Sequence, residues 1–139
     1  MKLPQAAVEF IESAPLAHVV TLNEDGSPHV TIVWVGLEDG EIVSGHLGNW
    51  KKLRNVQRDP RVAMSMEGTV RNEIGLTEYL VVNGRARLTE GGAAELLQRL
   101  AHTYLGPEVK FPPFDNPPPG VVMRVEPESI GGVGPWAEA

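Results

Sequence analysis

The chain has 139 residues, which fits about one domain, and its 12 basic and 18 acidic residues give a formal net charge of −6. This acidic balance argues against general nucleic-acid binding, and the absence of cysteine excludes disulfides and thiol chemistry. No signal peptide is recognisable, and the apolar runs are far shorter than the roughly 20 residues that cross a bilayer, so we expect one cytoplasmic domain over 1–139 without nucleic-acid or membrane partners.

The first third of the chain predicts one helix followed by three strands. Apolar residues recur at helical spacing over 4–14, and proline suits the first helical position there. The predicted strands are 16–22, 28–37 and 41–46. Two Glu-Asp-Gly turns separate them, which predicts an antiparallel meander. The middle strand is apolar on both faces, so we expect both to be covered, one of them by a second subunit or a flat ligand.

The segment 48–66 predicts a short helix, a stop and a buried strand. Asn49 is the expected N-cap, and the Asp-Pro pair at 59–60 ends the helix before a strand over 61–66. Residues at intervals of three form the stripe expected to face the core: Trp50, Leu53 and Val56.

Two lysines in the first turn of this helix, Lys51 and Lys52, indicate an anion site. A cation at that end opposes the helix macrodipole by roughly 0.3–1 kcal/mol. A bound anion offsets this cost, and free backbone N–H groups beside two ammonium groups make a small phosphate site. The wider segment is also basic: Lys51, Lys52, Arg54, Arg58 and Arg61. The alternative is that these charges are simply solvated on a surface helix.

The second half of the chain predicts two more strands, one helix and three irregular segments. In order, these are a loop over 67–75, a long strand over 76–88 bent at Asn83-Gly84, a helix over 92–105, a proline-rich surface loop over 110–120, a strand over 121–125 and a glycine-rich tail over 130–136. The total is six or seven strands with two or three helices, which indicates a barrel or a sandwich.

The sequence contains no recognisable set of catalytic side chains. The four histidines lack the spacing of metal ligands, so no metal site is expected, and no nucleophile elbow, phosphate loop or dinucleotide fingerprint is present. A bound cofactor would therefore carry any reaction. Among single residues, His46 ends a strand beside the expected anion site and is the one candidate proton donor. Trp136, in a glycine-rich tail, suits a position over a ring or a partner subunit.

A series of short motifs in fixed order covers nearly the whole chain. They are a G-x-P-H-V-T strand entry at 26–31, Lys-Lys-Leu-Arg-Asn at 51–55, Asp-Pro-Arg-Val at 59–62, Val-Asn-Gly-Arg-Ala at 82–86 and Gly-Pro-Trp at 134–136. In these motifs the chain resembles the pyridoxamine 5′-phosphate oxidase-like split β-barrel superfamily. It looks most like the branch of small deazaflavin-dependent oxidoreductases that use coenzyme F420.

The resemblance implies a mainly β (α+β) split β-barrel that forms a homodimer, with a flat tricyclic cofactor at the subunit interface. It implies that the backbone of 30–35 lies along the ring and that the lysine pair grips the cofactor phosphate. The strand-end residues then lie beside the phosphate, and the tail tryptophan lies near the ring or substrate. The implied cofactor-binding set is Val30, Thr31, Ile32, Val33, Trp34, Gly45, His46, Trp50, Lys51, Lys52 and Trp136.

One departure from the family bears on the cofactor. Relatives that oxidise pyridoxamine phosphate with FMN carry an arginine and a lysine where this chain has Val30 and Val35. The loss of two phosphate ligands favours F420 over FMN by elimination. We therefore expect an F420-dependent reductase that transfers hydride from the reduced deazaflavin to an unsaturated or conjugated small molecule. The alternatives are an FMN-binding oxidase or reductase, and a non-catalytic protein that carries a cofactor or senses its redox state.

Overall fold

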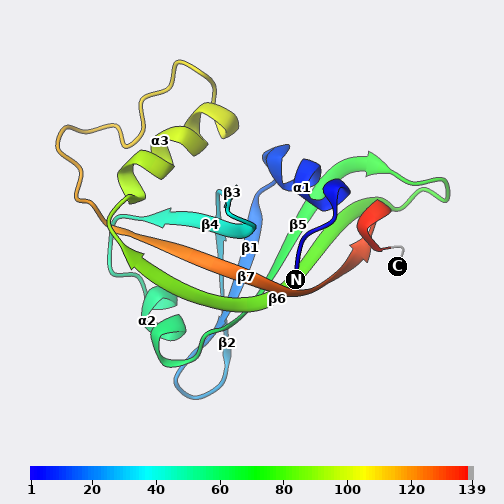
Figure 1. Cartoon of the computed structure of the whole chain (residues 1–139), viewed down its shortest axis with the longest axis horizontal. Helices are drawn as coiled ribbons and strands as arrows, with labels where there is room; N and C mark the ends of the chain where they lie inside the picture. The colour runs from blue at the N-terminus through cyan, green and yellow to red at the C-terminus, as the bar shows by residue number, and fades with distance from the viewer. Residues whose placement is uncertain (138–139) are drawn as a thin grey trace.

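The computed structural model describes residues 1–137, which form seven strands, three α-helices and a short 3₁₀ helix (Figure 1). The helices are α1 (Gln5–Glu12), α2 (Lys51–Arg58), α3 (Ala93–Tyr104) and the 3₁₀ helix η1 (Pro135–Ala137). The strands are β1 (Ala17–Leu22), β2 (Pro28–Val33), β3 (Gly36–Glu38), β4 (Glu41–His46), β5 (Arg61–Arg71), β6 (Thr77–Glu90) and β7 (Val121–Val133). The predicted numbers of strands and helices and the mainly β, α+β class are confirmed.

The seven strands form one antiparallel sheet in the order β2-β1-β5-β6-β7-β4-β3. β2 and β3 are consecutive in the chain but lie at opposite ends of this sheet, and only Trp34 and Val35 join them. A flat sheet would hold its end strands six spacings apart, roughly 29 Å. The link spans at most about 11 Å. The sheet therefore curls until its two ends meet at this link, which gives the split β-barrel that the family resemblance implies.

Several predicted boundaries are wrong. The strand expected over 28–37 is divided between β2 and β3. Both predicted antiparallel hairpins form, β1 with β2 and β3 with β4, but they lie at opposite ends of the sheet and do not make one continuous meander. The loop expected over 67–75 is mostly strand, since β5 and β6 continue as a hairpin beyond the barrel (Figure 1). The predicted irregularity at Asn83-Gly84 is confirmed, because the register of β6 with β7 shifts there.

The glycine-rich tail is also mostly strand, because β7 runs to Val133. Gly132 lies opposite Leu80 and has a φ of +108°, and a Cβ on it would collide with the backbone carbonyl of Tyr79. Glycine is therefore needed for β7 to stay paired with β6. The sequence pattern resembles a flexible tail, but its glycines serve the close approach of two strands.

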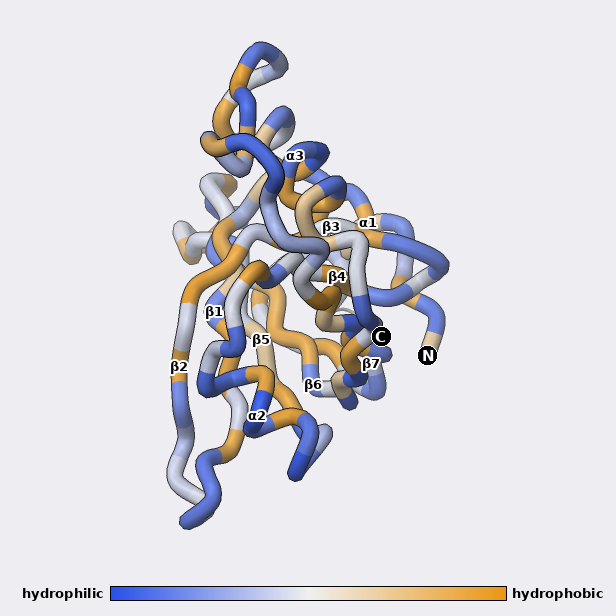
Figure 2. Tube along the Cα trace, turned by 90° about the vertical axis from the view of Figure 1, so that its left-hand side faces the viewer, coloured by the Kyte–Doolittle hydropathy of each residue, from blue (hydrophilic) through white to orange (hydrophobic). Residues whose placement is uncertain are grey.

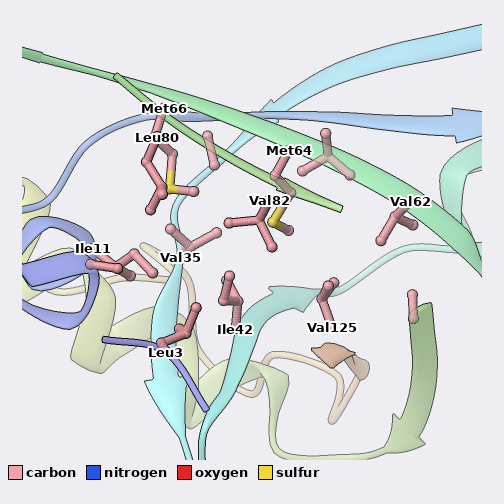
Figure 3. Close-up of a cluster of buried hydrophobic side chains, with 14 of the residues drawn as sticks. Leu3, Ile11, Val35, Ile42, Val62, Met64, Met66, Leu80, Val82 and Val125 are labelled. Carbon is pink, nitrogen blue, oxygen red and sulfur yellow. The ribbon is translucent and has the colours of Figure 1, made fainter. Parts of the chain in front are cut away.

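The barrel interior is filled by side chains that α1 and the strands direct inward (Figure 3). The largest of them include Ile11, Ile42, Met64, Met66, Leu80, Val82 and Val125. A second, smaller cluster lies between α3 and β4–β7: Val43, Leu96, Leu100 and Val122, with Trp34 and Tyr104 packed against it. This second cluster places α3 over the link between β2 and β3.

β2 forms an outer edge of the molecule (Figure 2). Val30 and Ile32, on its outer face, are 57% and 56% exposed. No element of the described chain crosses this outer face, so its predicted cover, a second subunit or a flat ligand, stays a prediction. Two large apolar side chains are left in contact with water.

Candidate functional site

A cavity of about 250 Å³ lies where β2 and β4 end and α2 begins. Six of its lining residues belong to the set predicted from the sequence: Ile32, Val33, Trp34, Gly45, His46 and Lys52. Three come from segments that the sequence did not connect with the site: Leu16, Leu97 and Phe111. We call His46 and Lys52 the polar wall, and Leu16, Trp34, Leu97 and Phe111 the apolar wall.

Lys52 places a buried cation in the polar wall. Its side chain is only 8% exposed, and its Nζ donates a hydrogen bond of 3.2 Å to Thr31 Oγ1 on β2. Burial lowers the pKa of this ammonium group, because removal from water disfavours the charged form. Within residues 1–137, no carboxylate forms an ion pair with it. A buried cation without a counter-ion is unfavourable, so an anion that enters the cavity is stabilised there.

His46 lies beside this cation in neutral form. Its ring is buried, and its Nε2 is 2.8 Å from Ser44 Oγ on the same strand. Burial, with a smaller contribution from the nearby charge of Lys52, lowers its pKa from 6.5 to about 3. At neutral pH the imidazole therefore carries no charge. A neutral imidazole is a much weaker acid than the imidazolium form, so the lowered pKa argues against the predicted role of His46 as proton donor.

Asn55 fixes the position of α2 against the sheet. It is buried, and its Nδ2 donates hydrogen bonds to Thr21 Oγ1 at 3.0 Å and to Asn23 Oδ1 at 3.1 Å. The apolar stripe of the helix is buried as predicted at Leu53 and Val56. Because polar and apolar contacts both hold α2 on β1, its first turn stays directed at the cavity.

Two predictions about the start of α2 are wrong. Asn49 is not the N-cap; that position is Trp50, and the helix has no side-chain cap. Trp50 is exposed and lies over Gly48, so it does not share the core-facing stripe. The chain turns into the helix one residue later than expected, which moves Trp50 outside the helical periodicity. It also leaves the first turn without a side chain that accepts its N–H groups.

The cluster of basic residues is less concentrated at the site than its sequence implies. Lys51 is exposed at the first helical position, and of the five residues Lys52 alone lines the cavity. The arginines have partners elsewhere: Arg54 the carbonyl of Asn49, Arg58 the carbonyl of Leu22 and Arg61 the carboxylate of Asp59. The predicted anion site is thus centred on one buried lysine, with a second at the rim of the helix.

β2 borders the cavity with its backbone as well as its side chains. Val30 and Thr31 do not line the cavity, but they precede the lining residues on the same strand, and Thr31 holds Lys52. Because β2 ends the sheet, the backbone groups along its outer edge have no partner strand in the described part of the chain. The predicted strand 30–35 is divided here, since Val35 leaves β2 and is buried in the barrel core.

The apolar wall is built from aromatic rings in contact. The ring of Trp34 stacks on Tyr104 with centroids 5.6 Å apart, and Phe111 meets Trp34 edge-on at 5.0 Å. Gly45 allows α3 to approach, because a Cβ on it would lie 2.9 Å from the carbonyl oxygen of Ala93. Sequence analysis missed Phe111 because it lies in the proline-rich segment, whose composition indicates only a surface loop.

The structure does not bring Trp136 to the cavity. Its ring is buried, lies 4.7 Å from that of Phe10, and its Nε1 donates a hydrogen bond of 3.1 Å to the carbonyl of Tyr79. It belongs to the barrel core, where η1 packs against α1. The expectation that a tryptophan in this tail lies outside the core is therefore wrong, because the tail is a strand followed by a tight helical turn.

Residues 1–137 contain no group of three or more histidine, aspartate or glutamate side chains placed to hold a metal ion. In the same part of the chain, no helix combines the length and the apolar composition needed to cross a membrane. The groups that the cavity itself presents are the buried ammonium group of Lys52, the imidazole of His46 and the apolar side chains of the apolar wall.

Comparison with known proteins agrees with this architecture. A family model described as pyridoxamine 5′-phosphate oxidase matches residues 3–134. Among solved structures, an F420 reductase has a TM-score of 0.74 at 23% identity, covering 93% of this chain and 98% of its own. A conserved hypothetical protein from Mycobacterium tuberculosis has a TM-score of 0.70 at 22% identity, covering 99% of this chain and 90% of its own. An FAD-binding protein from Mesorhizobium loti has a TM-score of 0.64 at 17% identity, covering 94% of each chain. A search of curated proteins found no match.

Proposed function

We propose, from the premise that this chain belongs to the pyridoxamine 5′-phosphate oxidase family, that it is an oxidoreductase that uses coenzyme F420. In this proposal the cofactor phosphate binds at Lys52 and the start of α2, and the flat ring lies along β2. The substrate is an unsaturated or conjugated small molecule that accepts hydride from the reduced deazaflavin.

The observation that carries the proposal is the buried Lys52 without a carboxylate partner among the described residues. A phosphate supplies the missing negative charge and also accepts hydrogen bonds from N–H groups at an uncapped helix start. The neutral His46 adds a second polar contact without a further charge. The residues present therefore fit a phosphate-bearing cofactor.

The remaining residues of the predicted set have defined tasks in this proposal. The free edge of β2, from Val30 to Val33, and the following Trp34 offer backbone N–H groups to the ring carbonyls. Gly45 lets α3 pack closely beside the ring, and Lys51 and Trp50 lie at the exposed rim. Trp136 is too far inside the core of its own chain to take part.

A second copy of the chain completes the site in this proposal. The cavity of about 250 Å³ is smaller than the roughly 300–1,000 Å³ that small-molecule sites usually occupy. It opens beside the exposed Val30 and Ile32. A homodimer that covers this face would enlarge the site and bury both side chains.

When bound, the reduced deazaflavin supplies a hydride, that is two electrons and one proton, to an electron-poor substrate carbon, and the second proton comes from solvent. The chain itself holds the phosphate, orients the ring and excludes water from one face. Orientation alone contributes several kcal/mol to such a barrier. No side chain at the site is assigned as a catalytic acid, because His46 is neutral.

FMN is the second candidate cofactor, since the same phosphate site and strand suit it and the family model matches. Val30 and Val35 are uncharged, so neither position offers a cation to a second phosphate contact. This favours F420. A third candidate, a carrier or redox sensor without turnover, is consistent with the lack of a catalytic side-chain set.

The test is a parallel titration of one preparation with F420, FMN and haem, followed by fluorescence or absorbance. Saturable F420 binding tighter than that of FMN supports the proposal. An F420 Kd weaker than about 100 μM, roughly −5.5 kcal/mol, rejects it. A yellow protein with an FMN spectrum as purified supports the second candidate. F420 binding without turnover of any enone, quinone or tetrapyrrole supports the third.

A further inference from the structure

We propose that the apolar wall is a subsite for a planar, uncharged ring compound and that Phe111 is its specificity-determining residue. The inference rests on the proposed function, in which the polar wall holds the anionic cofactor and the substrate occupies the opposite side of the cavity. It assigns a task to the proline-rich loop after α3, which sequence analysis left without one.

Gln98 on α3 holds Phe111 in the wall. Its Nε2 donates a hydrogen bond of 2.8 Å to the carbonyl of Val109, and its Oε1 accepts one of 3.0 Å from the backbone N–H of Phe111. One side chain thus binds the loop on both sides of Lys110. The ring of Phe111 is directed toward Trp34 by a fixed backbone rather than by apolar contact alone.

Trp34 is held just as firmly from the other side. Tyr104, on which it stacks, donates a hydrogen bond of 2.6 Å to the carbonyl of Pro15 and accepts one of 3.1 Å from the backbone N–H of Val35. The three rings of Trp34, Tyr104 and Phe111 therefore form a rigid group that links α3, the loop and the end of β2.

The composition of the wall selects the ligand. Leu16, Leu97 and Phe111 present only carbon, and the indole N–H is the one polar group that Trp34 adds. A charged group placed there would lose its hydration without gaining a partner, whereas a flat ring keeps close contact with aromatic edges and leucine side chains. The wall therefore favours an uncharged, planar ring of one or two fused cycles.

A neighbouring phenylalanine provides a matched control. A second cavity, of about 440 Å³, lies between α3 and the same loop, and both Phe111 and Phe114 line it. Phe114 does not line the cavity of the candidate site. An effect seen for Phe111 but not for Phe114 therefore belongs to the apolar wall and not to the loop as a whole.

The test measures binding of 2-naphthol by equilibrium dialysis, first without cofactor. The saturated analogue decahydro-2-naphthol has the same hydroxyl group but is not planar. We expect 2-naphthol to bind about tenfold or more tightly than the analogue, and Phe111→Ala to remove about tenfold of that affinity, which is about 1.4 kcal/mol. Phe114→Ala should change it by less than about twofold. If Phe111→Ala fails to fold, Phe111→Leu decides, with an expected loss of about threefold.

Charge is tested in Lys52→Ala, where no buried cation attracts an anion. There naphthalene-2-sulfonate should bind about tenfold more weakly than 2-naphthol or worse. Equal binding of the two ligands, equal binding of the planar and saturated alcohols, or equal losses for Phe111 and Phe114 overturn the inference.

The two proposals fail separately. The cofactor Kd should be unchanged within about twofold by Phe111→Ala, because the phosphate contact lies on the opposite wall. Phe111-dependent naphthol binding by a protein that binds neither F420 nor FMN retains the subsite and rejects the proposed function. Cofactor binding without Phe111-dependent naphthol binding retains the proposed function and rejects the subsite.

Discussion

The two walls of the cavity differ in how the chain builds them. The polar wall comes from one short stretch, the end of β4 and the start of α2, where His46 and Lys52 are six residues apart. The apolar wall is assembled from four separate segments, and its central ring, Phe111, lies in a loop without regular structure. The polar wall can therefore be predicted from one stretch of sequence. The apolar wall cannot, because it forms only when four distant segments come together.

The largest expected effect is a pH dependence of the unfolding free energy, and it tests whether His46 in the polar wall is uncharged. His46 has a pKa of about 3 in the folded chain and an ordinary value of 6.5 when unfolded. Between these values the unfolded state binds more protons, so the free energy of unfolding falls as the pH drops from 6.5 toward 3. The loss reaches up to about 1.4 kcal/mol per pH unit. Above pH 6.5 the contribution is constant.

Urea unfolding at several pH values between about 5 and 7 measures this slope, and His46→Gln should flatten it. The same substitution at the exposed His102, on α3, is the control for the change of histidine to glutamine itself. A variant at His46 with the slope of the wild type would contradict the burial of a neutral imidazole.

The next effect separates binding from folding at Lys52. Lys52→Ala should weaken cofactor binding by about 1–3 kcal/mol, as expected for a lost charged hydrogen bond. The apoprotein should keep its stability, because the buried ammonium group has no carboxylate partner within residues 1–137. Titration with F420 and thermal unfolding of the apoprotein measure the two quantities. Equal affinity of wild type and variant would remove the anion role from the polar wall.

The outer face of β2 can be compared with the apolar wall, because it is also apolar but is exposed. If a second copy covers it, Val30→Glu should weaken the dimer by about 1 kcal/mol or more per chain, because an apolar contact is replaced by a carboxylate. Sedimentation at micromolar concentration measures the dissociation. Leu105→Glu, at a similarly exposed position after α3, is the control. A wild-type monomer would contradict the dimer proposal directly.

The smallest effect distinguishes the two adjacent lysines. Lys51→Ala removes an exposed cation from the first turn of α2, so the apoprotein should gain about 0.3–1 kcal/mol of unfolding free energy. Cofactor affinity should fall by less than it does for Lys52→Ala, since an exposed charge is screened by solvent. Larger losses at Lys51 than at Lys52 would place the anion at the rim of the helix instead of in the cavity.

The sequence predicts the regular part of the fold well, because alternation and turn residues are local. The helix over 92–105 is found at 93–104, and both Glu-Asp-Gly turns connect strands. The prediction from sequence fails at the hairpin beyond the barrel. Val70 and Ile74 are exposed there, so burial does not impose an alternation of apolar and polar residues. It fails again at Gly132, whose role depends on a strand from elsewhere in the chain.

The candidate site divides in the same way. Lys52 was identifiable because a lysine at a helix start conflicts with local electrostatics, and such conflicts are visible in a single segment. Phe111 was not, since nothing in its neighbourhood signals that Gln98 holds it against Trp34. Trp136 was misjudged because its environment depends on Phe10, at the other end of the chain.

The position of β7 between β6 and β4 has a consequence for the order of folding. β4 joins the rest of the sheet only through β7, and Gly45 and His46 pair with Val122 and Val121 at its beginning. During synthesis, the outer edge of β4 has no partner strand until β7 has been made, because β7 follows β4 in the chain. Long-range pairing of this kind is slow. The candidate site, which includes Gly45 and His46, is therefore complete only after β7 has paired with β4.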